Sequence, residues 1–411
     1  MSARDSRRAS RYVPQGAPTV FYRLGALDEL GPLLDEWRVR RALLVTGRSL
    51  EAEGNVLGLV EDRLGDRAVA RFAGSRQHTS DGSVLAGRDA FAEAGCDALV
   101  SIGGGSAVDT AKGIALSAVV GDDLTPYQAR VRRGGAGQPS LVRGKIGAEI
   151  DSAVSRGSRG HNRVLVPHIA IPTTLSGAEY TDHAGITTAA TGVKEQIYHP
   201  DLVPVAVLLD PRVTAATPRE LWLSTGIKVL DHVVEIICSP ATSAASEALC
   251  LGALRRVTRH LAESSDQKAL DARAEMQIAA WLAVAGYPNQ MAGVGHAIDH
   301  QLGGLCGVPH GIAACCILPL AMKFNRKAAA AQLSLMAREV GEDHRPQAAI
   351  DAVRRLLREL QLPSRLRDAG VPEGRLPMIA ELAYADEAIV GNPRIVESPT
   401  QILEEILAPA W

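Results

Sequence analysis

Two patterns in the 411 residues predict an α/β domain with a parallel sheet, followed by an all-helical domain. In residues 18–212, short and continuously apolar runs alternate with segments of helical spacing, which is typical of parallel strands buried on both faces. In residues 213–411 almost no strand signal remains, and Ala, Leu, Arg and Glu predominate. Two domains also suit the length, at roughly 100–200 residues per domain.

The apolar runs place the strands of the first domain. The predicted strands are 42–46, 68–72, 98–102, 168–171 and 205–209. Segments 26–37 and 83–94, which lie between them, have helical spacing. In the second domain, Pro218-Arg219-Glu220 predicts the first turn of a helix, with a proline at its start and an acidic residue in the first turn.

Residues 1–17 and 127–163 stand apart from this pattern. The first segment lacks the apolar centre of a signal peptide, and we expect a disordered tail. The second segment carries eight basic residues against Glu149 and Asp151 and is dense in glycine and serine. We interpret it as a solvated insertion between two strands, with an anion-binding flap as the alternative.

The composition argues against several classes of protein. With 46% hydrophobic and 22% charged residues, the chain has a globular composition. Only 4% aromatic residues and a net charge of −2 argue against a nucleic-acid partner. No apolar run reaches the roughly 18 residues of a membrane span. The six cysteines include no C-x-x-C pair, so we expect a cytoplasmic protein without disulfides.

The first chemical signal is the glycine turn Gly103-Gly104-Gly105-Ser106. It follows the predicted strand 98–102 and precedes a helical segment, 107–116. Glycines allow a tight turn and a close approach of the backbone, and a helix N-terminus offers free N–H groups and a partial positive charge. This combination suits a pyrophosphate, although the spacing is not the G-x-G-x-x-G fingerprint.

The longer string Ser101–Lys112 resembles the iron-containing (group III) alcohol dehydrogenase family, whose fold the dehydroquinate synthases share. Further segments that resemble this family are Ile171–Glu179, Gly192-Val193-Lys194, Leu208–Pro211, Gly293–His310 and Ile317-Leu318-Pro319. The resemblance covers about residues 18–330. It implies that the first domain binds a dinucleotide, that the substrate lies between the domains, and that the chain forms a homodimer.

The resemblance also assigns residues to a nicotinamide cofactor. It implies that the phosphates lie at the glycine turn and that hydroxyl groups meet the nicotinamide end. The residues assigned in this way are Gly104, Gly105, Ser106, Asp109, Thr173, Thr174 and Lys194, the last at the cofactor ribose.

The choice between NAD and NADP depends on the residues after the first predicted strand. There the family usually has an acid that hydrogen-bonds the ribose 2′-OH and repels a 2′-phosphate. This sequence has Gly47-Arg48-Ser49 and no acid. Gly47 leaves room, and Arg48 and Ser49 can receive a phosphate. We therefore expect NADP to be accepted, and NAD remains the alternative.

The family's metal site is only partly present. In the family one carboxylate and three histidines hold a divalent ion, and His232, His296 and His310 match the histidines in spacing. His300 matches a histidine that the family places near the substrate as a proton relay. Lys228 stands where the family has the aspartate ligand. A charged lysine cannot bind a metal ion and repels it.

Three interpretations of Lys228 remain open. The three histidines hold a weaker metal ion, zinc in preference to iron. Alternatively, the Lys228 ammonium takes over the role of the cation and stabilises an alkoxide or a substrate carboxylate. In the third interpretation the chain has lost the ancestral reaction. Asp231 is an unlikely replacement ligand because it lies about 100° around the helix from His232.

The segments Leu175–Glu179 and His78-Thr79, together with the missing aspartate, resemble the maleylacetate reductase branch. The resemblance implies hydride transfer between NAD(P)H and a small carbonyl or alcohol substrate. A cationic, histidine-rich cleft favours an anionic keto acid. Lys228 would stabilise the oxygen and His300 would relay the proton, while His78 and His183 are candidates for the same cleft. The alternative is a redox-neutral lyase or cyclase of the dehydroquinate synthase type.

Overall fold

The sheet of the first domain has six parallel strands in the order β1-β10-β7-β4-β2-β3. The computed structural model describes residues 17–52, 55–132, 140–143, 164–189, 194–286 and 292–411. The strands of this sheet are β1 (Thr19–Tyr22), β2 (Ala42–Gly47), β3 (Ala68–Ser75), β4 (Ala98–Gly103), β7 (His168–Pro172) and β10 (Ala206–Leu209). The four central strands are buried along nearly their whole length, as expected for a sheet covered on both faces.

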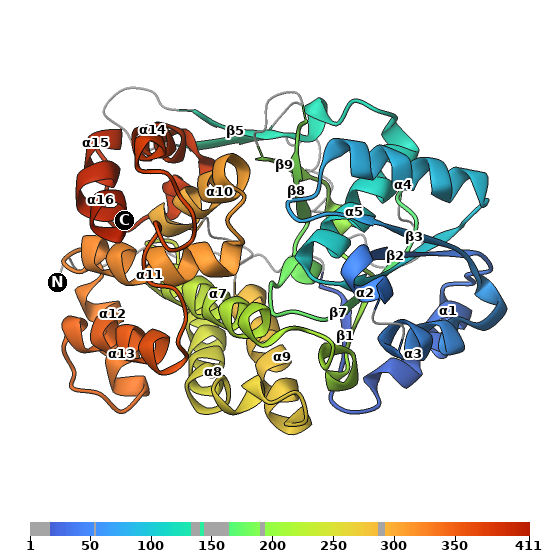
Figure 1. Cartoon of the computed structure of the whole chain (residues 1–411), viewed down its shortest axis with the longest axis horizontal. Coiled ribbons are helices and arrows are strands. Elements are labelled where there is room, and N and C mark those ends of the chain that lie inside the picture. Colours follow the sequence, from blue (N-terminus) through green and yellow to red (C-terminus); the bar gives the residue numbers. More distant parts are fainter. Residues whose placement is uncertain (1–16, 53–54, 133–139, 144–163, 190–193, 287–291) are drawn as a thin grey trace.

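Helices cover both faces of this sheet (Figure 1). On one face α1 (Leu30–Glu36) and α3 (Asn55–Leu64) pack against side chains such as Leu44. On the other face α4 (Asp81–Glu93) and α5 (Gly105–Val120) pack against Leu43. Neighbouring residues of β2 thus enter opposite cores, which is why the strand is apolar without interruption. The short α2 (Arg48–Ala52) follows the end of β2.

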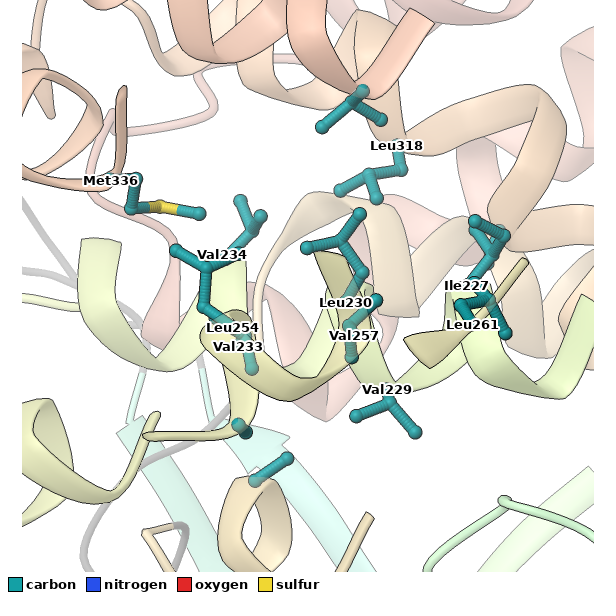
Figure 2. Packing of buried hydrophobic residues seen from close by; sticks show 14 of the residues in the cluster. Ile227, Val229, Leu230, Val233, Val234, Leu254, Val257, Leu261, Leu318 and Met336 are labelled. Carbon is teal, nitrogen blue, oxygen red and sulfur yellow. The ribbon is translucent and has the colours of Figure 1, made fainter. Parts of the chain in front are cut away.

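The described residues of the second domain form helices joined by turns and loops, with no strand among them. Its helices are α7 (Arg219–Cys238), α8 (Ala244–His260), α9 (Leu270–Ala285), α10 (Val294–Cys306), α11 (His310–Asn325), α12 (Ala330–Glu339), α13 (Pro346–Glu359), α14 (Leu376–Ala385), α15 (Pro399–Ile402) and α16 (Ala408–Ala410). Figure 2 shows Leu230 of α7 among Leu254, Leu318 and Met336 from three other helices. Burying one such leucine contributes about 1.5–3 kcal/mol. This core fixes the position of α7, and therefore also the position of Lys228 on that helix.

The predicted fold class is confirmed, and the five predicted strands are present with ends shifted by a few residues. The predicted helix 26–37 is in fact a 3-10 turn, Ala26–Glu29, followed by α1. The sequence did not predict β1 or the antiparallel pairs β5 (Ala129–Arg132) with β6 (Ser140–Arg143) and β8 (His183–Thr187) with β9 (Lys194–Tyr198). These strands are short or mixed in polarity, so they carry no continuous apolar signal.

Two predicted segments cannot be compared with the structure. The N-terminal tail, except for residue 17, and most of the basic insertion lie outside the described residues. Among the helices of the described residues, none is both long and apolar enough to span a membrane.

Candidate active site

The glycine turn joins β4 to α5 at the carboxyl edge of the sheet. Gly103 has a φ of 146°, which side-chain-bearing residues rarely adopt. Gly104 is the N-cap of α5, and no side chain of the described residues caps this helix, so its first N–H groups remain available to an anion. A Cβ at Gly105 would lie 2.8 Å from Ser176 Oγ. The turn therefore fits the pyrophosphate of a dinucleotide, and only glycine suits its tightest positions.

Helix α5 also holds the segment between residues 178 and 185 in place. Lys112 Nζ donates hydrogen bonds of 2.6–2.8 Å to three carbonyl oxygens between residues 178 and 183. Burial lowers the pKa of Lys112 to about 8. One turn earlier, Asp109 Oδ2 accepts a hydrogen bond of 3.2 Å from the N–H of Gly185 in β8. The two side chains thus fix the chain after β7 against the helix that follows the glycine turn.

A cavity of about 590 Å³ lies between the glycine turn and the helices of the second domain. The sequence-predicted site residues that line it are Gly47, Ser49, Gly104, Gly105, Ser106, Asp109, Thr173, Thr174, Lys194, Lys228, His232, His296, His300 and His310, and His78 and His183 line it too. Arg48 is exposed at the start of α2 and is not among its lining residues. Arg76, which follows β3, takes part in the lining although the sequence did not single it out.

Lys228 lies at the bottom of the cavity, only 5% exposed. Its Nζ donates to Asp231 Oδ2 at 2.7 Å and to Asp299 Oδ2 at 2.8 Å, and it lies 3.2 Å from His296 Nδ1. Glu235 Oε2 lies 3.2 Å from the same His296 nitrogen. None of the three carboxylates is among the lining residues of the cavity. The wall of the cavity near α7 and α10 is therefore formed by Lys228 and histidines, and the carboxylates that balance the Lys228 charge lie outside the cavity lining.

The ionisable groups of this cluster shift one another's pKa values. Burial alone would lower the pKa of Lys228, but the three nearby carboxylates outweigh burial and raise the pKa above its ordinary value. Burial raises the pKa of Asp299, although the lysine opposes this, whereas the Lys228 charge and other contacts outweigh burial at Asp231 and lower its pKa. Burial and Lys228 disfavour a charged His296, but the hydrogen bonds that its ring donates to the Asp231 and Glu235 carboxylates reverse this and raise its pKa to about 9.

Three other histidines of the cavity, His232, His300 and His310, are held in their neutral form. Burial and the Lys228 charge lower the pKa of His232, and burial with the lysine charges does the same to His310. Burial also lowers the pKa of His300, although Asp386 opposes it. Asp386 Oδ2 lies 2.9 Å from His300 Nδ1. This contact places the proton of the neutral ring on Nδ1 and leaves Nε2 as an acceptor.

His310 has a lysine partner. Lys194 Nζ donates a hydrogen bond of 3.0 Å to its Nε2. The His310 ring lies edge-on to His300 and to His78, with 5.9 Å between ring centroids in each case. His232 of α7, His296 and His300 of α10, and His310 of α11 thus form one continuous group, with 5.2–5.9 Å between successive ring centroids.

Two family models together match nearly the whole chain. The model described as iron-containing alcohol dehydrogenase matches residues 17–211, and that of the C-terminal part of the Fe-containing alcohol dehydrogenase family matches residues 222–410. The chain belongs to the iron-containing alcohol dehydrogenase family. It is an oxidoreductase of the alcohol dehydrogenase type, and these matches do not favour the redox-neutral lyase alternative.

Curated relatives of the chain are dehydrogenases and match it over most of their length. The NAD-dependent methanol dehydrogenase of Bacillus methanolicus is 28% identical over 93% of this chain and 96% of its own. The 1,3-propanediol dehydrogenase of Citrobacter freundii is 31% identical over 86% of this chain and 88% of its own.

Solved structures of the family share the fold. A 1,3-propanediol oxidoreductase, 28% identical, superimposes with a TM-score of 0.84 over 98% of this chain and all of its own. The maleylacetate reductase of Agrobacterium tumefaciens has a TM-score of 0.75 over 98% of this chain and 99% of its own. At 23% identity the latter shows the fold alone.

The family is described by its iron, but the residues around Lys228 do not fit a divalent ion. Ligand atoms of Asp231, Glu235 and His296 lie within 4.8 Å of one another, yet the Lys228 ammonium already supplies a cation to this group. With a pKa of about 9, His296 is protonated on both ring nitrogens at neutral pH and offers no lone pair. Lys194 engages Nε2 of His310. We therefore derive no step through a metal ion.

Sequence reasoning considered Asp231 only as a metal ligand and did not identify the carboxylates as partners of these side chains. Lys228 and Asp231 are three residues apart, and Asp299 lies three residues after His296, so helical spacing was an available signal for both. Asp386 is 86 residues from its partner His300, and no local pattern connects the two.

Proposed function

We propose that this enzyme transfers a hydride between NAD(P)H and a small anionic keto acid or its hydroxy acid. One observation carries the proposal: a single cavity has the glycine turn on one side and a lysine- and histidine-rich wall on the other. The carboxylates that balance Lys228 lie behind this wall, so a substrate meets cations and neutral imidazoles. A substrate carboxylate gains from such surroundings, whereas a neutral aldehyde gains less.

Bound NAD(P)H supplies the hydride. Gly104, Gly105 and the N-terminus of α5 would hold its phosphates, and the hydroxyl groups of Thr173 and Thr174 would meet its nicotinamide end. The enzyme must then stabilise the oxygen that becomes negative and deliver a proton to it. His300 is the proposed relay, with Asp386 fixing the orientation of its ring.

The test is a substrate comparison with purified enzyme, in which oxidation of NADPH and of NADH is followed at 340 nm. Three-, four- and five-carbon 2-keto acids are compared with the aldehydes that lack the carboxylate. We expect kcat/KM to be higher for a keto acid than for its neutral counterpart by about tenfold or more, which corresponds to about 1.4 kcal/mol. Equal or greater kcat/KM for the neutral aldehydes would overturn the anionic substrate class.

A further inference from the structure

Two lysines reach the histidine group, and their ammonium groups are used differently. Lys228 directs two N–H groups at Asp231 and Asp299, and its third side faces His296. It is 5% exposed, and its charge is neutralised by side chains outside the cavity. Little of this ammonium remains for a substrate oxygen.

Lys194 reaches the same cavity from β9. Among the described residues its Nζ makes one hydrogen bond, to His310 Nε2 at 3.0 Å, so two N–H groups are left. It forms no ion pair within the described part of the chain. The stem of Lys194 lies over Gly185, where an added Cβ would overlap it. The missing side chain in β8 therefore gives the lysine its path into the cavity.

We propose that Lys194, oriented by His310, is the catalytic residue that hydrogen-bonds the substrate's carbonyl oxygen. This inference rests on the proposed hydride transfer and names the group that stabilises the developing charge. In the reduction the carbonyl carbon gains the hydride and the π electron pair moves to the oxygen, which then takes up a proton. NAD(P)H is oxidised and the carbonyl is reduced. Two N–H groups of a cation aimed at this oxygen supply the stabilisation that Lys228 is too fully engaged to give.

In this proposal His310 is a positioning residue, because it orients Lys194. Its Nε2 accepts from Lys194, so the neutral ring carries its proton on Nδ1, which has no hydrogen-bond partner among the described residues. The ring is held between His78 and His300 by edge-on contacts. Removing the imidazole would leave the ammonium without the hydrogen-bond partner that orients it among the described residues.

The resemblance to the family gives a competing role, in which Lys194 binds the cofactor ribose. The two roles differ in what they stabilise. A ribose ligand contributes to cofactor binding in every complex, whereas a ligand of the carbonyl oxygen contributes mainly when charge develops on it. Binding of NADPH and turnover at saturating NADPH therefore distinguish them.

The experiment compares the parent with Lys194→Met, Lys194→Ala and Lys194→Arg, and with Lys327→Met as a control at an exposed lysine. The substrate is whichever carbonyl compound the parent reduces best. For Lys194→Met we expect kcat to fall by about 100-fold or more, the size of losing an oxyanion donor, while the Kd for NADPH changes by less than about threefold. Ethylammonium in the buffer should restore part of the kcat of Lys194→Ala.

Three results would overturn the assignment: unchanged kcat in Lys194→Met, a weakened Kd for NADPH with kcat retained at saturation, or an alanine variant that no amine rescues. If Lys194→Met does not fold, Lys194→Ala also removes the ammonium, and the same comparison of Kd with kcat applies to it. A parent that prefers neutral aldehydes refutes the proposed substrate class but leaves Lys194 testable with that aldehyde. A parent that reduces no carbonyl compound refutes both proposals.

Discussion

Replacing Lys228 by methionine should destabilise the protein strongly and in a pH-dependent way. The substitution keeps the length of the side chain and removes the cation between Asp231 and Asp299, each only 1% exposed. Breaking a buried ion pair on one side costs about 3–5 kcal/mol because the remaining charge is left without a partner. The free energy of unfolding is measured by urea denaturation followed by circular dichroism. Lys327→Met, at an exposed position, is the matched control and should change it by less than about 0.5 kcal/mol.

The sign of the pH dependence follows from the carboxylates. Burial already raises the pKa of Asp299 above the unfolded value of about 3.9, and without the lysine this pKa should rise further, while that of Asp231 should rise from its lowered value. A carboxyl group with a raised folded-state pKa loses stability as the pH rises from the unfolded to the folded value. The deficit of the variant should therefore be larger near pH 8 than near pH 5. Adding Asp299→Asn should recover part of it. A deficit below about 1 kcal/mol at both pH values would refute the buried ion-pair interpretation.

Three further substitutions test other parts of the cavity. Gly105→Val should weaken NADPH binding by about tenfold or more, because its side chain would collide with the facing segment, whereas Gly58→Val, with open space around it, should leave the Kd unchanged. Arg76→Ala should raise the KM for NADPH more than that for NADH, while Arg48→Ala, outside the cavity lining, should not; the reverse result would restore the sequence-based assignment. Asp386→Asn should lower kcat by about tenfold or more with the Kd for NADPH retained, and an unchanged kcat would remove it from the proton path.

The sequence predicts the fold well because its signals are local. The continuous apolar runs of β2 and β4 arise from burial on both faces, and the glycines after β4 arise from the turn itself. The spacing of His296, His300 and His310 likewise places three histidines in one cavity. Periodicity and turn chemistry are properties of neighbouring residues, so they can be read without the tertiary structure.

The chemistry of the site depends on contacts that no local pattern contains. Lys228 interrupts the family's ligand set, but the sequence could not show that its ammonium turns toward Asp299, 71 residues away. Nor could it show that Lys194 pairs with His310, 116 residues away, or that Arg48 lies outside the cavity lining. The direction in which a side chain points depends on packing between elements that are distant in the sequence. In the proposal, the directions of Lys228 and Lys194 leave Lys194 available for a substrate.

The central claim is that this chain reduces a carbonyl group with its own cations in place of a divalent metal ion. It is tested most directly by measuring the metal content and the turnover of one anaerobically purified sample, by elemental mass spectrometry and NADPH oxidation, before and after treatment with a chelator. The account predicts far less than about one iron or zinc ion per chain and a kcat that the chelator does not change. About one ion per chain, lost together with activity and restored by iron or zinc, would contradict it.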